Sequence, residues 1–242
     1  MADDVLLRLS GVHTHIGRYH ILHGVDLAVR AGRLTMLLGR NGAGKTTTLR
    51  TIMGLWRASA GTIAFAGQPI TARATPGIAR LGIAYVPETM GIFGQLTVRE
   101  NLLLASGPAG LDPARLARVF AVFPVLKQKF QQAAGTLSGG QKQMVAIARA
   151  IIEDRRLIIV DEPTKGLAPA VIGQLIEAFQ ALKHTSTTIL MVEQNFHMAS
   201  ALGDDVAVMD DGRVVHTGTM RDLAADEALQ ARLLGLSLAS HQ

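Results

Sequence analysis

Residues 34–49 read LTMLLGRNGAGKTTTL, and this stretch decides the fold. An apolar run of strand length ends at Gly39, and after four further residues Gly44, Lys45 and Thr46 complete the pattern G-x-x-x-x-G-K-[ST]. A glycine-rich turn that only caps a helix could contain the same glycines. Because the pattern stands here between a strand-like and a helix-like segment, it indicates a phosphate-binding loop instead.

The loop has the chemistry that a triphosphate requires. Its glycines allow φ > 0 and leave no Cβ between the backbone and an anion. The backbone N–H groups and the following helix N-terminus supply partial positive charge. Lys45 adds a full charge for the β- and γ-phosphates, and the Thr46 hydroxyl is suited to ligate Mg²⁺. The expected nucleotide-binding residues of the loop are Gly39, Asn41, Gly42, Ala43, Gly44, Lys45, Thr46 and Thr47.

Composition places the chain among ordinary globular proteins. With 242 residues, 48% of them apolar and 18% charged, one large domain or one domain with inserted subdomains is expected. The absence of cysteine fits a reducing compartment and excludes disulfides and thiolate metal sites. Residues 1–4 show no secretion-signal pattern, and no apolar run approaches the roughly 20 residues of a membrane-spanning helix.

A formal net charge of +5 and a pI near 10.0 favour an anionic partner. A polyanion at the nucleotide site, together with solvated arginines, explains this charge. Nucleic acid and an anionic membrane surface are the alternatives. Since no basic block is dense, direct binding of nucleic acid is not expected.

Alternating strands and helices predict an α/β fold with a mostly parallel sheet. Apolar patterning predicts strands at residues 5–9, 25–30, 34–38, 62–66, 83–86, 157–160 and 188–192, and a hairpin formed by 206–209 and 213–216. Helices are expected from the loop to about residue 55 and at 97–104, 113–123, 139–150, 169–183 and 220–236. The stretch between 97 and 154 indicates an all-helical insertion.

Two carboxylates follow the apolar strand at 157–160. In a parallel sheet, a strand that ends beside the phosphate loop would bring Asp161 and Glu162 next to the γ-phosphate. Asp161 then suits the Mg²⁺ shell, directly or through water. Glu162 is free to polarise the attacking water as general base. Alone, Asp-Glu after an apolar run also fits a strand that enters a turn.

The segment Leu137-Ser138-Gly139-Gly140-Gln141 is the most specific part of the sequence. A serine followed by two glycines at a helix start exposes N–H groups and a hydroxyl to an anion. An ordinary N-cap accounts for the serine but not for the whole pentapeptide. With this segment, the chain closely resembles the ATP-binding cassette (ABC) ATPases over essentially its full length.

The resemblance implies a P-loop NTPase fold that works as a dimer. In that family, the phosphate loop of one subunit and the Leu-Ser-Gly-Gly-Gln segment of another enclose each ATP. Ser138, Gly139, Gly140 and Gln141 would then contact nucleotide that the partner subunit holds. The implied architecture is one cassette over 1–242: residues 1–87 and 155–242 form a RecA-like core with an antiparallel β subdomain, and 88–154 form the helical subdomain.

Several positions depart from the common family pattern. Glu88 replaces a glutamine that senses Mg²⁺ and the membrane subunit, and as an anion it can still bind Mg²⁺ or position water. Gln194 replaces a histidine that contacts the γ-phosphate; it can donate a hydrogen bond there but carries no charge. Ala168 stands where an aspartate is frequent. Together the segments around these positions resemble the second (F-type) ATPase of branched-chain amino acid importers and related urea importers.

The adenine contact is left open by the sequence. Family members commonly have an aromatic residue before a glycine, where this chain has Ile16 before Gly17. Adenine could pack on Ile16 or be stacked by His15 or Tyr19, and Tyr19 is the preferred candidate, although it could equally be ordinary packing.

Two further groups of residues have simple explanations. The histidines at 13, 15, 20 and 23 lack a carboxylate or thiol to complete a metal site, so a metal is not expected there. The apolar segment 90–93 lies, by resemblance, where a membrane subunit docks, although it could also pack within the cassette.

These features predict an ATPase subunit, with ATP and Mg²⁺ as cofactors, that powers an importer of branched-chain amino acids or a related small polar solute. Implied partners are a second ABC ATPase subunit, integral membrane permease subunits and, indirectly, a periplasmic solute-binding protein. The expected location is the cytoplasmic face of the bacterial inner membrane. The alternatives are a soluble cassette that acts on nucleic acid or in assembly, and a nucleotide-binding regulator without turnover. Residues 45–138 leave no room for the long coiled coil of cassettes that manage DNA ends.

Overall fold

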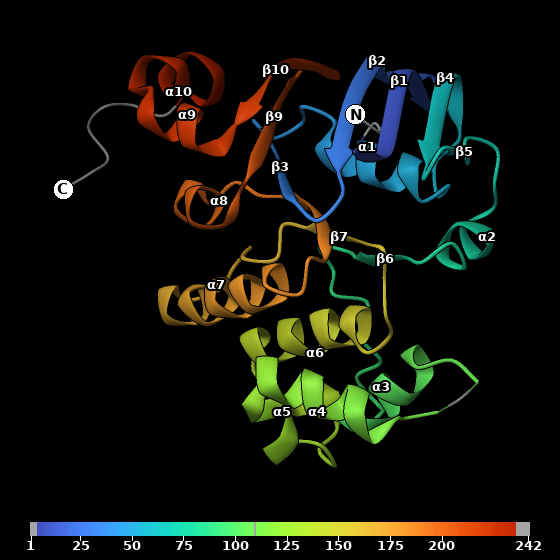
Figure 1. Ribbon diagram of the computed structural model, residues 1–242, viewed down its shortest axis with the longest axis vertical. Helices are drawn as coiled ribbons and strands as arrows, with labels where there is room; N and C mark the ends of the chain where they lie inside the picture. Colours follow the sequence, from blue (N-terminus) through green and yellow to red (C-terminus); the bar gives the residue numbers. More distant parts are fainter. Residues whose placement is uncertain (1–3, 109, 236–242) are drawn as a thin grey trace.

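The computed structural model describes residues 4–108 and 110–235, which form two β-sheets with helices packed around them (Figure 1). The larger sheet has six strands in the order β10-β9-β3-β8-β7-β6. Every neighbouring pair is parallel except β9 and β10, which form the expected hairpin. Its strands are β3 (Leu34–Gly39), β6 (Ile83–Val86), β7 (Leu157–Asp161), β8 (Thr188–Val192), β9 (Asp205–Asp210) and β10 (Arg213–Thr219).

The central strands are apolar along their length because both faces of this sheet are covered. Successive side chains of a strand point to opposite faces. Thus Met36, Ile158 and Met191 face one apolar cluster, while their neighbours Leu37, Ile159 and Leu190 face another. Such continuous apolar runs are typical of buried parallel sheets. The α/β fold class is as predicted.

The second sheet is antiparallel, with the order β2-β1-β4-β5. Helix α1 (Lys45–Ile52) packs against it, and the Thr14 and Thr51 hydroxyls lie 3.1 Å apart in this interface. Leu49 and Ile52 of α1 join the cluster that also contains Leu37 of β3. The strands are β1 (Val5–Ile16), β2 (Tyr19–Arg30), β4 (Ala58–Phe65) and β5 (Gln68–Pro69).

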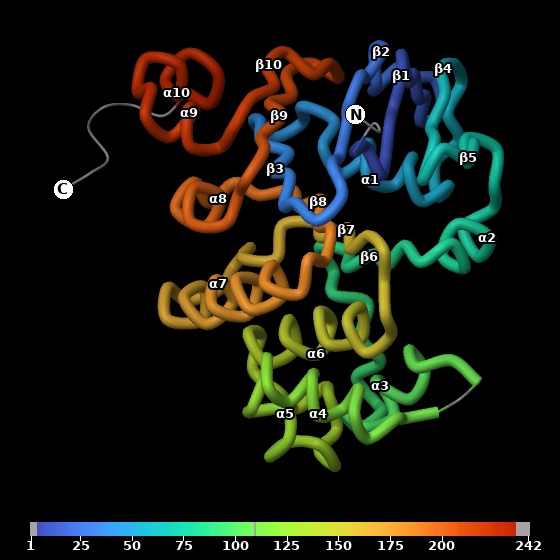
Figure 2. Tube along the Cα trace, viewed as in Figure 1, coloured from blue at the N-terminus to red at the C-terminus, as the bar shows by residue number. Residues whose placement is uncertain are grey.

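Helices alone lie between β6 and β7 in the described residues, apart from a single β-bridge between Thr97 and Ala133. Thr97 and Glu100 form the predicted capping box, with Thr97 N donating to Glu100 Oε2 at 2.8 Å. The elements are α3 (Val98–Ala105), α4 (Pro113–Val122), α5 (Pro124–Gln128), a 3₁₀ turn (Ala134–Thr136) and α6 (Gly139–Ile151). The tube trace in Figure 2 shows α3–α6 gathered at one end of the molecule, away from the antiparallel sheet. The division at 88–154 remains a prediction.

The remaining helices complete the layers around the larger sheet. They are α2 (Thr75–Ala79), α7 (Pro169–Lys183), α8 (Phe196–Leu202), α9 (Met220–Ala225) and α10 (Glu227–Leu234). Figure 1 shows α7 between the central sheet and the α3–α6 group. Phe179 of α7 is fully buried, as expected of a helix between two layers.

Some predicted boundaries were wrong. Strands expected at 5–9 and 25–30 extend to Ile16 and back to Tyr19, because the polar histidines there hide the alternating pattern. The helix after the phosphate loop ends at Ile52 rather than near residue 55. The last helix breaks at Asp226, whose carboxylate accepts from Leu229 N at 2.9 Å and so starts α10. Its expected end at Leu236, like the start Met1–Asp3, lies outside the described residues.

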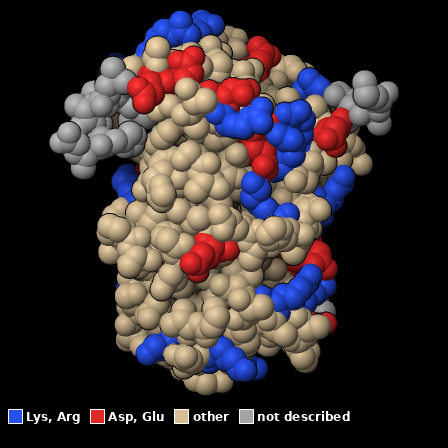
Figure 3. Space-filling model, turned by 60° about the vertical axis from the view of Figure 1, so that its left-hand side comes forward, with Lys and Arg blue, Asp and Glu red and all other residues tan. Residues whose placement is uncertain are grey.

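Two surface properties bear on function. On the face in Figure 3, Lys and Arg side chains alternate with Asp and Glu and leave a broad uncharged area. A continuous basic field of the kind that nucleic-acid binding requires is therefore not seen on this face. Within the part of the chain that the structure describes, none of the helices has the length and apolar character needed to span a membrane.

Candidate functional site

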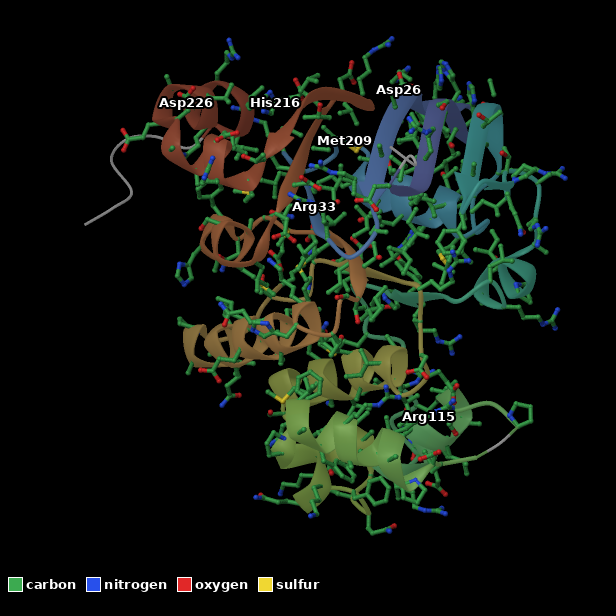
Figure 4. All side chains as sticks on the ribbon, viewed as in Figure 1. Asp26, Arg33, Arg115, Met209, His216 and Asp226 are labelled. Carbon is green, nitrogen blue, oxygen red and sulfur yellow. The ribbon has the colours of Figure 1, made fainter. Side chains whose placement is uncertain are left out.

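The phosphate loop joins β3 to α1, as the sequence predicts. Gly39 has φ 143°, and a Cβ there would lie 2.2 Å from the carbonyl oxygen of Met209, a residue labelled in Figure 4. Only glycine fits this close approach. A Cβ on Gly42, at φ 84°, would meet no heavy atom within 4 Å, so this side of the loop faces open space. The loop borders an open pocket of about 380 Å³.

Lys45 is the first residue of α1 and is almost completely buried. Its Nζ donates to Gly39 O at 2.8 Å and to Arg40 O at 3.0 Å. Burial lowers the pKa of Lys45, and the nearby Glu162 and Asp161 carboxylates partly oppose this shift. The two carbonyl groups are neutral acceptors. Phosphate oxygens bound in the pocket would give the Lys45 ammonium negatively charged acceptors instead.

Asp161 ends β7 and reaches the phosphate loop although its strand is not the neighbour of β3. Strand β8 lies between them in the sheet, and the end of β7 nevertheless reaches the loop, as expected. Thr46 Oγ1 donates to Asp161 Oδ1 at 3.0 Å, and Tyr85 Oη donates to Oδ2 at 3.1 Å. Burial raises the pKa of Asp161, while these two hydrogen bonds lower it. A hydroxyl and a carboxylate side by side are hard oxygen donors that suit Mg²⁺.

Glu162 follows directly and is held in an uncommon backbone conformation, with φ 46°. Non-glycine residues with positive φ are rare, and such strain is found frequently at functional sites. Glu162 Oε1 accepts from Gln194 Nε2 at 2.6 Å and lies 4.0 Å from Lys45 Nζ. The side chain is about 10% exposed. A carboxylate is thus placed at the edge of the pocket and kept in one orientation.

Gln194, which the sequence predicts to contact the γ-phosphate, contacts Glu162 in this structure. It also lines the same pocket as Lys45 and Thr46. The predicted phosphate contact remains a prediction, and the hydrogen bond to Glu162 adds a role in orienting that carboxylate.

Glu88 lies just after β6 and lines the pocket as well. Its Oε1 accepts from Lys165 Nζ at 2.5 Å, in the turn that follows Glu162. Sequence reasoning did not single out Lys165, because an isolated lysine in a turn carries no motif. The structure brings it within 3.8 Å of Glu162 Oε2.

Glu193 is a second residue that the sequence did not identify. Its side chain is fully buried, and burial raises its pKa although several hydrogen bonds oppose the shift. Oε1 accepts from Thr164 N at 3.1 Å and Oγ1 at 2.8 Å, and Oε2 accepts from the backbone N–H groups of Gln194 and Asn195 at 3.0 Å. One carboxylate therefore joins the turn after Glu162 to the segment that carries Gln194. The sequence signal that could have identified this residue is its position directly before Gln194.

Ser138 to Gln141 form the start of α6. Ser138 N donates to Gln141 Oε1 at 3.1 Å, and Gln141 N donates to Ser138 Oγ at 3.3 Å, which is a capping box. Ser138 and Gly139 are exposed, whereas Gly140 packs against Val171 of α7. None of these four residues lines the pocket at the phosphate loop of the same chain.

The preferred adenine candidate lies outside the pocket. Tyr19 is 62% exposed and contacts Arg18, whose guanidinium lies 5.4 Å from the ring centroid. Ile21, two residues further along β2, lines the pocket with the phosphate loop. Ile21 had no distinguishing pattern in the sequence, and the adenine contact of Tyr19 remains a prediction.

The four histidines of the β1–β2 hairpin form a cluster of stacked rings. The ring centroids of His15 and His20 lie 4.1 Å apart, and His13 Nδ1 lies 3.0 Å from His20 Nε2. Across the ranges 4–108 and 110–235, no group of three or more His, Cys, Asp or Glu side chains has the arrangement of a metal site.

Comparison with known proteins identifies the relatives of this arrangement. The family model described as ABC transporter matches residues 22–165. The high-affinity branched-chain amino acid transport ATP-binding protein BraG of Pseudomonas aeruginosa is 37% identical over 232 residues, which cover 95% of this chain and 100% of that protein. The probable branched-chain amino acid transport ATP-binding protein LivF of Archaeoglobus fulgidus is 33% identical, with 96% and 99% coverage.

A crystal structure of the ADP conformation of an ATP-binding cassette of an ABC transporter has the same fold. Its TM-score is 0.80 at 26% identity, and the match covers 93% of this chain and 96% of that one. These relatives are subunits of transporters, so the comparisons do not favour a cassette that works without a transporter.

Proposed function

Because this chain belongs to the ABC transporter family, as an ATP-binding cassette that hydrolyses ATP, we propose that it powers an importer of branched-chain amino acids or a related small polar solute. The family resemblance predicted from the Leu137–Gln141 segment is confirmed. The solute class is proposed by analogy with BraG and LivF, whose names describe branched-chain amino acid transport.

One observation carries the proposed chemistry: the phosphate loop and Glu162 line a single pocket, and Asp161 is hydrogen-bonded to Thr46 of that loop. Lys45 is proposed to bind the β- and γ-phosphates. Glu162 is proposed to accept the proton of the attacking water. Its carboxylate lies 4.0 Å from the Lys45 ammonium, and Lys45 is the group proposed to bind the γ-phosphate that the water attacks. Gln194 is proposed to hold Glu162 in place and to donate a hydrogen bond to the γ-phosphate.

Thr46, Asp161 and Glu88 are proposed as the Mg²⁺ side chains. The proposal is supported by the hydrogen bond between Thr46 and Asp161, which places the two oxygens side by side, and by the position of Thr46 and Glu88 on the pocket wall. When bound, Mg²⁺ would offset charge on the β- and γ-phosphate oxygens. The chain's own contribution is to present oxygen donors at the loop, and the buried Tyr85 hydroxyl orients the Asp161 carboxylate.

A second subunit is proposed to complete the site. Ser138 and Gly139 are exposed at the start of α6, outside the pocket of their own chain. The Gly139 N–H and the Ser138 hydroxyl are therefore proposed to contact a phosphate group that another molecule holds, while the Ser138 N–H is used in the capping box. ATP held between two chains would favour their closed arrangement, and hydrolysis would release it. The partner is a sister ATPase or a second copy of this chain.

Permease subunits are proposed to dock at the loop after β6. Phe93 is 48% exposed and Leu104 of α3 is 59% exposed, which is unusual for such large apolar side chains. The Arg149 guanidinium lies 5.0 Å from the Phe93 ring centroid and donates to Gly91 O, so the loop is held from α6. With such subunits, the chain would lie on the cytoplasmic face of the inner membrane, and a periplasmic solute-binding protein would act through the permease.

Substitution of the two central residues tests the ATPase mechanism. Glu162→Gln should retain ATP binding and lower the hydrolysis rate by about 10²–10⁴-fold, the usual range for a general base. It should also trap a dimer with ATP, measured by size-exclusion chromatography. Lys45→Ala should lose nucleotide affinity.

The matched control is Glu177→Gln, because Glu177 is an exposed residue of α7 outside the pocket. A Glu162→Gln variant that hydrolyses ATP at the parent rate would remove Glu162 from the mechanism. Unchanged ATP binding by Lys45→Ala would contradict the assignment of the loop. Affinity purification from membranes, followed by identification of the bound permease and binding protein, tests the partners and the solute class.

A further inference from the structure

Lys165 lies between two carboxylates at the mouth of the phosphate pocket. Its Nζ is 2.5 Å from Glu88 Oε1 and 3.8 Å from Glu162 Oε2. The lysine side chain is 60% exposed, whereas Glu88 is 33% exposed and Glu162 10%. All three side chains line the pocket, and the ammonium is the most exposed of the three charged groups.

The charges around the pocket show why this position matters. Two carboxylates, those of Glu88 and Glu162, line a cavity whose proposed ligand is itself an anion, and the buried Asp161 carboxylate lies behind Thr46 of the same wall. Lys45 faces the other oxygen of Glu162, at 4.0 Å, and donates to two backbone carbonyl groups. Lys165 is placed to compensate Glu88, which stands where the ABC family usually has an uncharged glutamine.

We propose that Lys165 is a positioning residue for MgATP, which acts by pairing with Glu88. The ammonium holds the Glu88 side chain on the wall of the pocket and offsets its negative charge. The ion pair as a whole is then neutral, like the glutamine side chain that the family usually has at the position of Glu88. This inference rests on the proposed function, in which MgATP occupies this pocket. Without Lys165, Glu88 would repel the phosphate groups, because MgATP keeps a net negative charge.

The pair also joins two segments of the site. Glu88 begins the loop after β6, and Lys165 lies in the turn between β7 and α7. Lys165 N donates to Glu162 O at 3.2 Å, so the same residue closes the turn that carries the proposed base. An ordinary surface ion pair contributes little to stability. Here the effect is expected on ligand affinity, because Glu88, with one-third of its side chain exposed, lines the pocket of the proposed ligand.

A double-mutant cycle tests the pairing. The variants are Lys165→Met, Lys165→Arg, Glu88→Gln and the double variant Glu88→Gln with Lys165→Met. KM for MgATP and kcat are measured, together with equilibrium binding of a fluorescent ATP analogue with Mg²⁺. Lys127→Met is the matched control, since Lys127 is an exposed lysine of α5.

Lys165→Met should raise KM and the dissociation constant for MgATP by about tenfold at low salt, with kcat changed much less, because uniform binding is lost. In the Glu88→Gln background, the same substitution should have less than about a twofold effect, since its partner charge is gone. Lys165→Arg should retain parent affinity, and added salt should shrink the effect of Lys165→Met. If Lys165 only stabilised the fold, the effect of Lys165→Met would depend neither on Glu88 nor on the salt concentration in this way.

Two results would overturn the inference. One is an unchanged affinity for MgATP in Lys165→Met. The other is a loss of affinity that is equally large in the Glu88→Gln background, which would mean that Lys165 does not act through Glu88. These results differ from failure of the proposed function, in which the parent chain itself would not bind MgATP.

Discussion

Replacing Glu193 by Gln should weaken the connection between the turn after Glu162 and the segment that carries Gln194, the two residues proposed to act in hydrolysis. Glu193 is buried and accepts from Thr164 N, Thr164 Oγ1, Gln194 N and Asn195 N. Glutamine has nearly the same shape, but one oxygen becomes an NH₂ group that can only donate. If its oxygen keeps the N–H groups of Gln194 and Asn195, the NH₂ group faces the Thr164 N–H.

The size of the effect follows from counting donors. The Thr164 hydroxyl can rotate and accept from the new NH₂ group, so one buried N–H group loses its partner. An unsatisfied buried donor costs about 1–3 kcal/mol. Removal of a buried charge offsets part of this cost, since burial raises the pKa of Glu193. We expect the free energy of unfolding to fall by about 1–2 kcal/mol, and more for Glu193→Ala, which removes both acceptors.

Catalysis should suffer more than ATP binding. The affected turn carries Glu162, and the other segment carries Gln194, whose amide orients the Glu162 carboxylate at 2.6 Å. A small displacement of a catalytic group can lower a rate by about a hundredfold, and we expect a loss in kcat of at least about tenfold. Lys45 and the phosphate loop are not held by Glu193, so the dissociation constant for MgATP should change by less than about threefold.

Urea unfolding and steady-state ATP hydrolysis, with Glu177→Gln as control, measure these quantities. If Glu193→Gln has the parent's stability and kcat within a factor of two, the two segments do not depend on this carboxylate. A loss of ATP affinity as large as the loss in kcat would also contradict the reasoning.

Three other substitutions are expected to have defined effects. Hydrogen bonds from Arg30 and Arg33 outweigh burial and lower the pKa of Asp205, so its stabilising effect is present above the ordinary carboxyl range and is lost as pH falls. Asp205→Asn should therefore lower the unfolding free energy at pH 7 by about 1 kcal/mol, and in urea titrations the gap to the parent should close as pH falls below the ordinary carboxyl range. Gly140→Ala should cost about 1–3 kcal/mol in the same assay, because its Cβ would lie 2.5 Å from Val171 Cγ1, and a Gly140→Ala, Val171→Ala double variant should recover most of the loss. Ile21→Ala should weaken ATP binding by about three- to tenfold through lost apolar contact, whereas an equal or larger effect of Tyr19→Ala in the same binding assay would assign the adenine contact to Tyr19.

Local motifs predicted the parts of the site that depend on local geometry. The glycine pattern at 39–44 requires positive φ, and Gly39, Gly42 and Gly44 adopt it. The fold class also followed from the sequence, because strands covered on both faces are apolar throughout and are easy to recognise. Thr97 and Ser138 both cap a helix start, as a pattern of residues three apart in the chain can indicate, and the box that Ser138 forms with Gln141 is an addition from the structure.

Features that depend on contacts between distant segments were not predictable. Lys165 and Glu88 are 77 residues apart, and Glu193 and Thr164 are 29 apart, so no pattern in a short window relates them. The order of the strands was hidden for the same reason, since β8 inserts between β3 and β7 although it follows both in the chain. The β1–β2 hairpin was missed locally, because its histidines pack on one another and replace the apolar residues expected in a strand.

Polar side chains at the phosphate loop make hydrogen bonds within the chain, and these bonds bear on how strongly one subunit would respond to ATP. Lys45 bonds two carbonyl groups, Thr46 bonds Asp161, Gln194 bonds Glu162, and Lys165 bonds Glu88. Binding MgATP therefore exchanges these partners for new ones, and the net gain is the difference between two sets of similar interactions. At the start of α6, the capping box uses the Ser138 and Gln141 N–H groups, whereas the exposed Gly139 N–H and the Ser138 hydroxyl proton are not part of it, so contacts made by them across the proposed dimer would add to affinity without an equal internal loss. On this reasoning, we expect ATP to drive closure of the proposed dimer more strongly than it binds to one subunit alone.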